Sequence, residues 1–253
     1  MDLVGKIVVV TGAGSGIGKS IATVFAQAGA AHVVCTDVDF DSAQATARAC
    51  NGTAMSLDVT SQSEIEKVVA TVEAQIGPID LFVSNAGILT LGGVEVDTDA
   101  WQSIWDVNVM AHVHAARALV PRMIARGGGY FLNTASAAGL LSQIGSAPYA
   151  VTKHAAIGFA EWLSLTHGDD GIKVSVLCPQ GVHTAMTQGL EGHVAAVDGM
   201  MQADDVAHCC VQGLKSEEFL ILPHPQVLDY MRMKTADYDR WLGGMRKLNR
   251  RFQ

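Results

Sequence analysis

The sequence lacks three features that mark large classes of protein. Basic residues number 17 against 25 acidic ones, and the formal charge of −8 argues against a surface that follows nucleic-acid phosphates. No apolar run approaches the roughly 18 residues that a membrane-spanning helix requires. Residues 1–12 do not resemble a signal peptide, because their apolar run is short, follows an acidic residue and continues into a glycine-rich turn. We therefore expect a cytoplasmic protein with neither nucleic acid nor a membrane as partner.

Cysteine is scarce and forms no recognisable pattern. The five cysteines, an odd number, include no C-x-x-C pair, and apolar neighbours surround Cys35 and Cys178. This favours buried thiols over a disulfide, a metal site or a catalytic nucleophile. The histidines also show no metal-ligand spacing, so no metal is predicted.

The sequence does contain an alternation of strand and helix patterns over its whole length. No linker rich in Pro, Ser or charge interrupts the 253 residues, which favours a single domain spanning 1–253. Apolar runs predict strands at residues 6–11, 32–36, 53–57, 80–84, 129–134, 173–178 and 219–222. Amphipathic stretches predict helices between them, among them 99–126 and 147–166. The alternation predicts an α/β fold, a Rossmann-like doubly wound parallel sheet of about seven strands with helices on both faces.

Two later segments have weaker patterns. Residues 184–201 combine small residues with scattered Met and Leu, which predicts a mobile flap. The tail from Tyr238 gathers five basic residues and predicts a solvated or subunit-contacting helix rather than an anion site. Earlier in the chain, Ser61 and Glu64 match the capping box at a helix start.

The first predicted strand runs into a glycine-rich turn that opens a helix. A P-loop would need a glycine where Ala13 stands, and the usual G-x-G-x-x-G spacing fails in both frames. The pattern present is T-G-x-x-x-G-x-G, with glycines at 12, 16 and 18. These glycines suit a tight exit from the strand, an approach of the backbone to a pyrophosphate, and close packing of helix on strand, respectively. The helix N-terminus then offers free N–H groups to phosphates.

The second strand ends in Asp37, about 20 residues beyond this turn, where a carboxylate can accept hydrogen bonds from ribose hydroxyls. The same charge repels the additional phosphate of NADP. Its neighbours Thr36 and Val38 carry no compensating charge, and Lys19 is the one nearby cation. The pattern favours NAD as the cofactor.

Tyr149 and Lys153 are spaced by one helical turn in a segment that is otherwise small and apolar. A nearby ammonium favours the phenolate, and we expect it to lower the pKa of Tyr149 toward neutrality. The spacing alone is common by chance, so its context matters. Ser136 ends an upstream strand, where its hydroxyl can bind a substrate oxygen, and Asn108 lies on an apolar helix face, which favours a hydrogen-bond network.

In order and spacing, these residues together resemble the short-chain dehydrogenase/reductase family over about residues 1–225. Asp58 after the third strand and the N-A-G triplet at 85–87 add to the resemblance. The resemblance implies that Tyr149 is the general acid/base, that Lys153 lowers its pKa and holds the nicotinamide ribose, and that Ser136 orients the substrate oxygen. Asn108 would anchor a water linking the lysine to solvent.

The resemblance also implies a set of cofactor contacts and a division of the chain. Residues 1–135 would mainly bind the dinucleotide, 136–225 would carry the catalytic residues and the substrate loop, and 226–253 would form a C-terminal extension. The expected cofactor contacts are Gly12, Ser15, Gly16, Ile17, Gly18, Asp37, Val38, Asp58, Val59, Asn85, Ala86, Gly87, Tyr149, Lys153, Pro179, Val182 and Thr184.

Two positions depart from the family pattern. Ser84 stands where Asn is common, a change that leaves cofactor binding intact in our interpretation. Gln180 occupies the glycine position of P-G-x-V-x-T, where it would reshape the pocket wall, while Val182 and Thr184 keep their places. His183 adjoins this motif, but the proton path is complete without it.

The resulting hypothesis is an NAD-dependent enzyme that oxidises a secondary alcohol, or reduces the ketone, by hydride transfer. The alternative is an NAD-binding sensor on the same fold without turnover, which would have no need of the proton donor. Family members commonly pair long helices across two-fold axes, so a homotetramer is predicted. A largely apolar pocket for a medium-sized substrate is expected from Ala138, Leu140, Leu141, Gln143, Ile144, Gln180, Met186, Leu190, Met200 and Met201.

Overall fold

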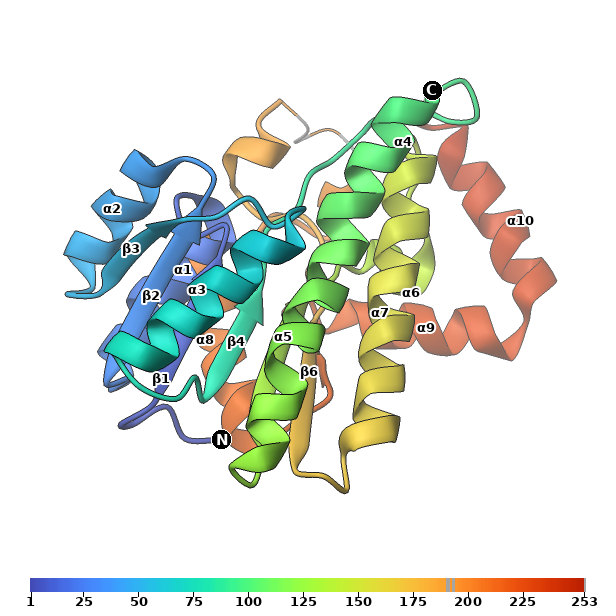
Figure 1. Cartoon of the computed structure of the whole chain (residues 1–253). Coiled ribbons are helices and arrows are strands. Elements are labelled where there is room, and N and C mark those ends of the chain that lie inside the picture. Colours follow the sequence, from blue (N-terminus) through green and yellow to red (C-terminus); the bar gives the residue numbers. More distant parts are fainter. Residues whose placement is uncertain (190–191, 193, 253) are drawn as a thin grey trace.

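Seven parallel strands form one sheet in this computed structural model, which describes residues 1–189, 192 and 194–252. The strand order is β3-β2-β1-β4-β5-β6-β7, so the chain reverses its winding direction between β1 and β4 (Figure 1). The strands span Ile7–Thr11 (β1), His32–Asp37 (β2), Thr53–Ser56 (β3), Leu81–Ser84 (β4), Gly129–Thr134 (β5), Ile172–Leu177 (β6) and Leu220–Ile221 (β7). All seven predicted strands are confirmed, and a ligand cleft is expected at the carboxyl ends of β1 and β4.

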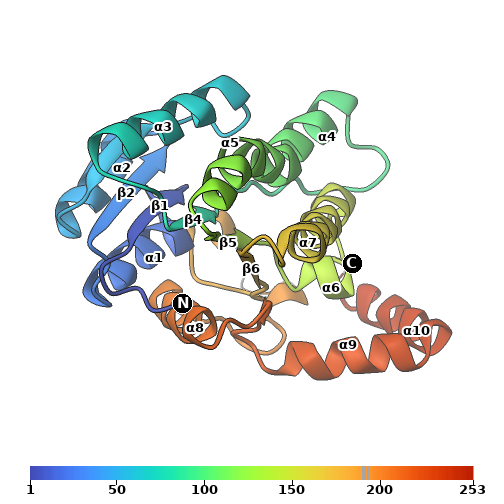
Figure 2. The same cartoon turned by 60° about the horizontal axis from the view of Figure 1, so that its bottom comes forward.

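Helices cover both faces of the sheet, as predicted (Figure 2). One face carries α3 (Gln62–Gln75), α5 (Ala111–Ala125) and α7 (Ala147–His167), which pack on Phe82 and Phe131 from the central strands. The other carries α1 (Gly16–Gln27), α2 (Phe40–Ala49) and α8 (Ala203–Ser216). Continuous apolar strands thus lie between two hydrophobic layers, as the sequence pattern requires.

The predicted helix 99–126 is interrupted. It consists of α4 (Thr98–Trp105), one π-helical turn η1 (Asp106–Met110) and α5. The Ala111 N–H bonds to the Asp106 carbonyl, five residues back, instead of continuing the α-helical pattern. Such turns often mark functional positions, and this one contains Asn108.

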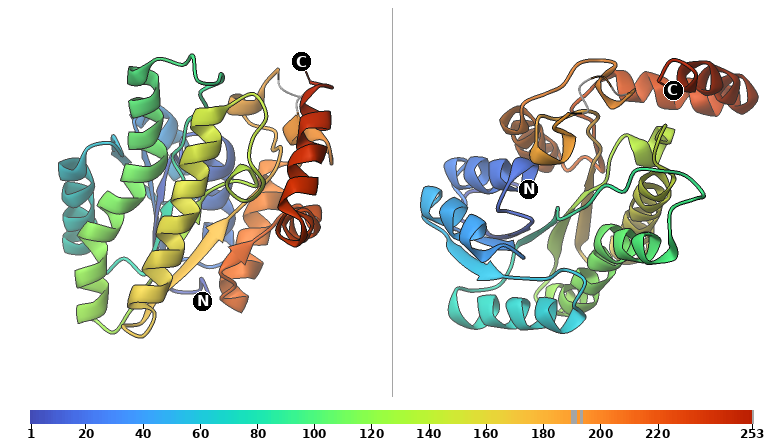
Figure 3. Two further views of the ribbon diagram at one scale, coloured as in Figure 1. Left: turned by 90° about the vertical axis from the view of Figure 1, so that its right-hand side faces the viewer. Right: turned by 90° about the horizontal axis from the view of Figure 1, so that it is seen from above.

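Parts of the chain after β6, other than α8 and β7, build a wall beside the sheet (Figure 3). It includes the short helical turns η2 (Ala185–Thr187) and η3 (Val194–Ala196), then α9 (Gln226–Ala236) and α10 (Tyr238–Asn249). Val227 of α9 is fully buried against the short helix α6 (Ala138–Leu141). A bridge between Val182 and Met201 closes the base of the predicted flap 184–201, of which 190, 191 and 193 lie outside the described residues.

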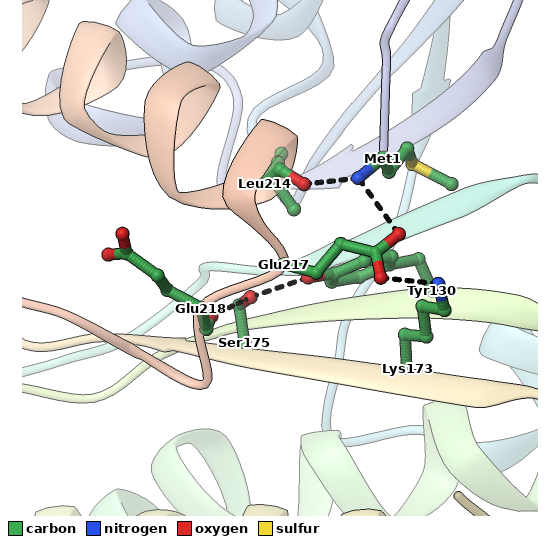
Figure 4. Close-up of polar contacts among 7 residues, drawn as sticks. All are labelled: Met1, Tyr130, Lys173, Ser175, Leu214, Glu217 and Glu218. Carbon is green, nitrogen blue, oxygen red and sulfur yellow. Dashed lines mark hydrogen bonds and ion pairs between the residues drawn. The ribbon is translucent and has the colours of Figure 1, made fainter.

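A polar network fixes the opposite, amino-terminal edge of the sheet (Figure 4). Glu217, in the left-handed conformation after α8, accepts from Lys173 and from the Met1 amino group. The Tyr130 hydroxyl bonds Ser175 at 2.8 Å. These contacts join α8, β5 and β6 at the edge remote from the predicted ligand cleft.

Among the described residues, no helix has the length and apolarity needed to cross a membrane.

A local signal explains the start of α3. Ser61 accepts from the Glu64 N–H, as the capping box predicts, but the Glu64 carboxylate accepts from the Asp58 N–H rather than from that of Ser61.

Of the five cysteines, Cys35, Cys178 and Cys210 are buried as expected, whereas Cys50 and Cys209 are half-buried.

Candidate active site

The glycine-rich turn lies between β1 and α1, at the carboxyl edge of the sheet. Gly12 and Gly16 have φ of +63° and +51°, which side chains with a Cβ rarely adopt. Gly18 has another role. A Cβ there would lie 2.1 Å from the Gly12 carbonyl oxygen, so this glycine permits the close packing of α1 on the turn. Gly18 was predicted as a cofactor contact, but it does not line the cleft.

Asn85 holds the turn from the next strand. Its Nδ2 donates to the Thr11 carbonyl at 3.0 Å, and its Oδ1 accepts from Thr134 at 3.2 Å. The Thr11 hydroxyl in turn accepts from the Asn85 and Ala86 N–H groups. The ends of β1, β4 and β5 are thereby locked together under the cleft.

Asp37 lies at the end of β2 beside the same turn. Its carboxylate accepts from the Gly14 N–H at 2.9 Å and the Asp39 N–H at 3.1 Å. No ion pair to Asp37 is present among the described residues, so its charge is not balanced by a cation. A ribose could still bond the remaining lone pairs of this carboxylate.

These residues surround a cavity of about 410 Å³. Its wall contains every predicted cofactor contact except Gly18: Gly12, Ser15, Gly16, Ile17, Asp37, Val38, Asp58, Val59, Asn85, Ala86, Gly87, Tyr149, Lys153, Pro179, Val182 and Thr184. The free N–H groups at the start of α1 and the glycines with positive φ fit the diphosphate of a dinucleotide, and the Asp37 carboxylate fits its ribose.

Tyr149 lies in the first turn of α7, whose start is fixed by a cap that the sequence analysis did not identify. The Ser146 hydroxyl accepts from the Tyr149 N–H and donates to the Thr90 carbonyl. One turn later, the Lys153 side chain is only 3% exposed, and its ammonium donates to the Thr134 carbonyl at 3.1 Å. The same ammonium lies 5.5 Å from the centroid of the Tyr149 ring.

Burial controls the pKa values of this pair. It raises the pKa of Tyr149, although the neighbouring Ser136 hydroxyl acts in the opposite direction. It also lowers the pKa of Lys153 to about 8. The expectation that the ammonium lowers the pKa of the phenol is wrong, because the pKa of Tyr149 is raised. Loss of hydration opposes the charged form of each group and is the largest cause of both shifts.

Ser136 and Asn108 occupy the predicted neighbourhood. The Ser136 hydroxyl donates to the Pro179 carbonyl at 3.3 Å and accepts from the Ala138 N–H at 3.1 Å. The Asn108 amide accepts from the Ile88 N–H at 2.9 Å and donates to the Ile88 carbonyl and to Thr152. These bonds connect the π-helical turn to α7 and to the segment after β4, so the Asn108 side chain is engaged within the protein.

A second cavity of about 760 Å³ adjoins the first. The predicted pocket residues Ala138, Leu141, Gln143, Ile144, Gln180, Met186 and Met200 line it. Leu140 and Met201 were predicted there but are not in its wall, and Leu190 lies outside the described residues. His183 lines neither cavity and is exposed. No cluster of metal-binding side chains occurs in the described part of the chain.

The C-terminal tail contributes cavity residues that sequence reasoning missed. The five basic residues of this tail are exposed, as a solvated helix requires, but one face of α10 also contributes Arg240, Trp241, Met245 and Leu248 to the wall of the larger cavity. Trp241, Met245 and Leu248 follow the spacing of an amphipathic helix, and this was the signal that could have indicated a buried face.

Ser136 and Tyr149 line both cavities, so a dinucleotide cleft and a largely apolar pocket meet at a serine and a tyrosine. This combination of fold and site defines a dinucleotide-dependent oxidoreductase. The family described as short chain dehydrogenase matches residues 6–194, and the chain belongs to this family. It is an oxidoreductase that acts on hydroxyl or keto groups.

Two named dehydrogenases and one solved structure are also similar to this chain. A 1-deoxy-11-beta-hydroxypentalenate dehydrogenase from Streptomyces exfoliatus is 39% identical over 95% of this chain and 90% of its own. A meso-2,3-butanediol dehydrogenase from Serratia marcescens is 33% identical over 73% of this chain and 74% of its own. A short-chain dehydrogenase/reductase from Burkholderia phymatum, crystallised in complex with NAD, superposes with a TM-score of 0.86 at 28% identity, covering 94% of this chain and 96% of that one.

Proposed function

We propose that the protein is an NAD-dependent dehydrogenase of secondary alcohols, with Tyr149 as general acid/base. The observation that carries the proposal is the shared boundary of the two cavities. Ser136 and Tyr149 line the cleft with the features of a dinucleotide site and also the largely apolar pocket. A substrate oxygen in that pocket would meet both hydroxyls beside the bound cofactor.

In the proposed mechanism, the protein positions the substrate and moves one proton. When bound, the nicotinamide supplies the hydride acceptor for oxidation and the donor for reduction. Ser136 donates a hydrogen bond to the substrate oxygen and holds it near the phenol of Tyr149. During oxidation Tyr149 takes the hydroxyl proton, and during reduction it returns one. Lys153 stabilises the phenolate form at the moment of transfer.

Asp37 supports NAD over NADP, since its uncompensated carboxylate would face an additional phosphate on the ribose. The Burkholderia structure, determined with NAD, is consistent with this choice. We also propose that residues 1–135 mainly bind the dinucleotide, that 136–225 carry catalysis and the substrate loop, and that 226–253 form the outer substrate wall. A cytoplasmic location remains a prediction of the sequence.

The proposed substrate is a medium-sized, largely apolar alcohol or ketone. Apolar side chains dominate the wall of the larger cavity, and Met186, Met200 and Met245 give it an adaptable surface. The names of the relatives fit an alicyclic or small hydroxy compound, since one acts on a hydroxypentalenate and another on a butanediol.

Replacing Tyr149 with Phe tests the proposal. Tyr149→Phe should abolish NADH formation from a panel of secondary alcohols while leaving NAD affinity nearly unchanged. Tyr130→Phe is the matched control, because it removes a phenol that bonds Ser175 at the remote sheet edge (Figure 4). Activity that survives in Tyr149→Phe would place the acid elsewhere. NAD binding by the wild type without turnover of any alcohol or ketone would favour the sensor.

A further inference from the structure

Arg240 is the only basic residue that the described part of the chain contributes to the wall of the larger cavity. The residue is exposed, and its guanidinium makes no ion pair or hydrogen bond with any described residue. Two other basic residues of the same helix, Arg246 and Lys247, do not line the cavity. A cation without a partner in the protein, at the edge of a largely apolar cavity, is available to a ligand.

Arg240 lies on the face of α10 that is turned to the cavity. The residues of this helix region that line the wall follow the spacing of one helix face: Asp237, Arg240, Trp241, Gly244, Met245 and Leu248. Gly244 comes one turn after Arg240, and a Cβ placed on it would meet no atom within 4 Å. Space is therefore open beside Arg240 on the cavity side of the helix.

The stability of α10 does not explain the charge of Arg240. The residue is in the first turn of the helix, where the positive end of the helix dipole disfavours a cation. The helix start is fixed by Asp237, whose Oδ1 accepts from the Arg240 N–H at 2.9 Å. Asp237 is also the only acidic residue of the described wall, and it is engaged as this cap. The guanidinium is therefore not needed by the helix that carries it.

The two ends of the cavity carry opposite charges. Ser136 and Tyr149 lie where the cavity meets the dinucleotide cleft, and no residue of α10 lines that cleft. Gln180 also lines both cavities, and the Asp198 carboxylate accepts from it and from Tyr230 at 3.0 Å each. A negative charge thus lies near the cleft end and a positive charge at the α10 end. An anionic ligand would be oriented with its charge away from the cleft.

We propose that Arg240 binds a carboxylate of the substrate at the end of the cavity remote from the cleft. The inference rests on the proposed oxidation of a secondary alcohol at Ser136 and Tyr149. A guanidinium binds a carboxylate through two parallel hydrogen bonds, and a single cation matches one negative charge better than the two of a phosphate. The substrate is therefore a hydroxy acid, or the corresponding keto acid, whose two polar groups lie at opposite ends of an apolar frame.

Three bicyclic decalin alcohols that share one carbinol carbon test this inference. The first carries a carboxylate on the remote ring, the second carries a primary carboxamide at that position, and the third carries a carboxylate beside the carbinol. The amide has nearly the shape of the carboxylate but no charge. With NAD and the wild-type enzyme, the remote carboxylate should have the lowest KM, about tenfold below that of the amide.

Two variants separate the charge of Arg240 from the charge of the helix. In Arg240→Gln the ratio of the two KM values should fall toward one, and Arg240→Lys should retain part of it. Arg246→Gln is the matched control, since it removes the same charge from an exposed position of α10 outside the cavity wall. It should leave the ratio unchanged.

Three results would overturn the inference: equal KM values for remote carboxylate and amide in the wild type, an equal weakening of both in Arg240→Gln, or the same loss of selectivity in Arg246→Gln. If no compound yields NADH, the proposed function fails. The inference is then decided separately by calorimetric titration of the protein with the remote carboxylate and the amide. Tighter binding of the carboxylate, lost in Arg240→Gln, supports it, and equal binding or none refutes it.

Discussion

The ammonium of Lys153 lies 5.5 Å from the centre of the Tyr149 ring, and both side chains border the cleft that fits a dinucleotide. Proximity alone does not make the phenol acidic, because burial opposes the charged form of each group. A positively charged nicotinamide bound in the cleft would add a favourable charge beside the phenolate. If Tyr149 is the general acid/base, as we propose, cofactor binding should therefore lower its pKa.

The buried lysine should make stability depend on pH. Its pKa is lowered from 10.5 to about 8 in the folded protein, so between these values the unfolded chain holds a proton that the folded protein lacks. Raising the pH through this window therefore raises the free energy of unfolding, by at most about 1.4 kcal/mol per pH unit. Denaturant unfolding of the wild type and Lys153→Met, compared from pH 7 to 10, isolates this contribution. A constant difference between the two proteins would show that the lysine pKa is not lowered.

Asp37→Ala should shift cofactor preference toward NADP. The change removes a carboxylate that would repel the additional phosphate, and Val38→Arg beside it would supply a partner. We expect the ratio of kcat/KM for NAD over NADP to fall by about tenfold in the single variant and further in the double variant. Asp39→Ala is the matched control, since Asp39 caps α2 and lies outside the cleft wall. An unaltered preference in Asp37→Ala would assign the selection to another group.

Two glycines should respond oppositely to replacement by alanine. A Cβ at Gly18 would lie 2.1 Å from the Gly12 oxygen, so Gly18→Ala should displace the turn, lower stability by about 1–3 kcal/mol and weaken NAD binding. Gly158, inside α7, has no atom within 4 Å of a Cβ, and Gly158→Ala should stabilise the helix by about 0.5–1 kcal/mol. Thermal unfolding and NAD titration measure both. Unchanged NAD affinity in Gly18→Ala would refute the packing argument.

Cys50 should be the most reactive of the five cysteines. Its sulfur lies 3.8 Å from that of Cys35, and a hydrogen bond from the Cys35 thiol lowers the pKa of Cys50 to about 7. The other half-buried cysteine, Cys209, has a pKa raised by burial. Iodoacetamide labelling followed by mass spectrometry should find Cys50 modified first, with a rate that rises through pH 7. Removing the donor in Cys35→Ala should slow this labelling at neutral pH, and faster labelling of Cys209 would contradict the prediction.

The predicted homotetramer would use the outer face formed by α4 and α7. Large apolar side chains are exposed there, with Trp105, Trp162 and Leu165 at 37%, 54% and 87%. Leu165→Glu should place charge in the proposed contact and reduce the mass measured by light scattering at micromolar concentration. Val94→Glu changes an equally apolar, exposed residue outside these helices and should leave the mass unchanged. A wild-type monomer would refute the tetramer.

Local patterns were enough to predict the sheet and most of the residues that line the smaller cavity. Buried parallel strands require continuous apolar runs, and the turn after β1 requires glycine where φ is positive, so both are visible in short windows of sequence. The π-helical turn at Asn108 was not predicted, because one additional residue per turn hardly disturbs an apolar stripe. The pKa of Tyr149 was misjudged since spacing reveals a nearby charge but not the loss of water around it.

Contacts between distant segments were not predictable in the same way. The apolar spacing of Trp241, Met245 and Leu248 indicates that one face of a helix is covered, but not which cavity it covers. Likewise, Gln180 was recognised as a departure from the family pattern, while its bond to Asp198 depends on how the chain returns after η3.

The position of α10 has a consequence for how the substrate range of this protein can change. The helix has no fully buried residue, and it borders the larger cavity without taking part in the sheet or the cleft. Exchanging this last segment for that of a relative should therefore transfer a preference for one alcohol over another while the proposed site at Ser136 and Tyr149 stays intact. Selectivity in such a scaffold can evolve, or be engineered, from its C-terminus.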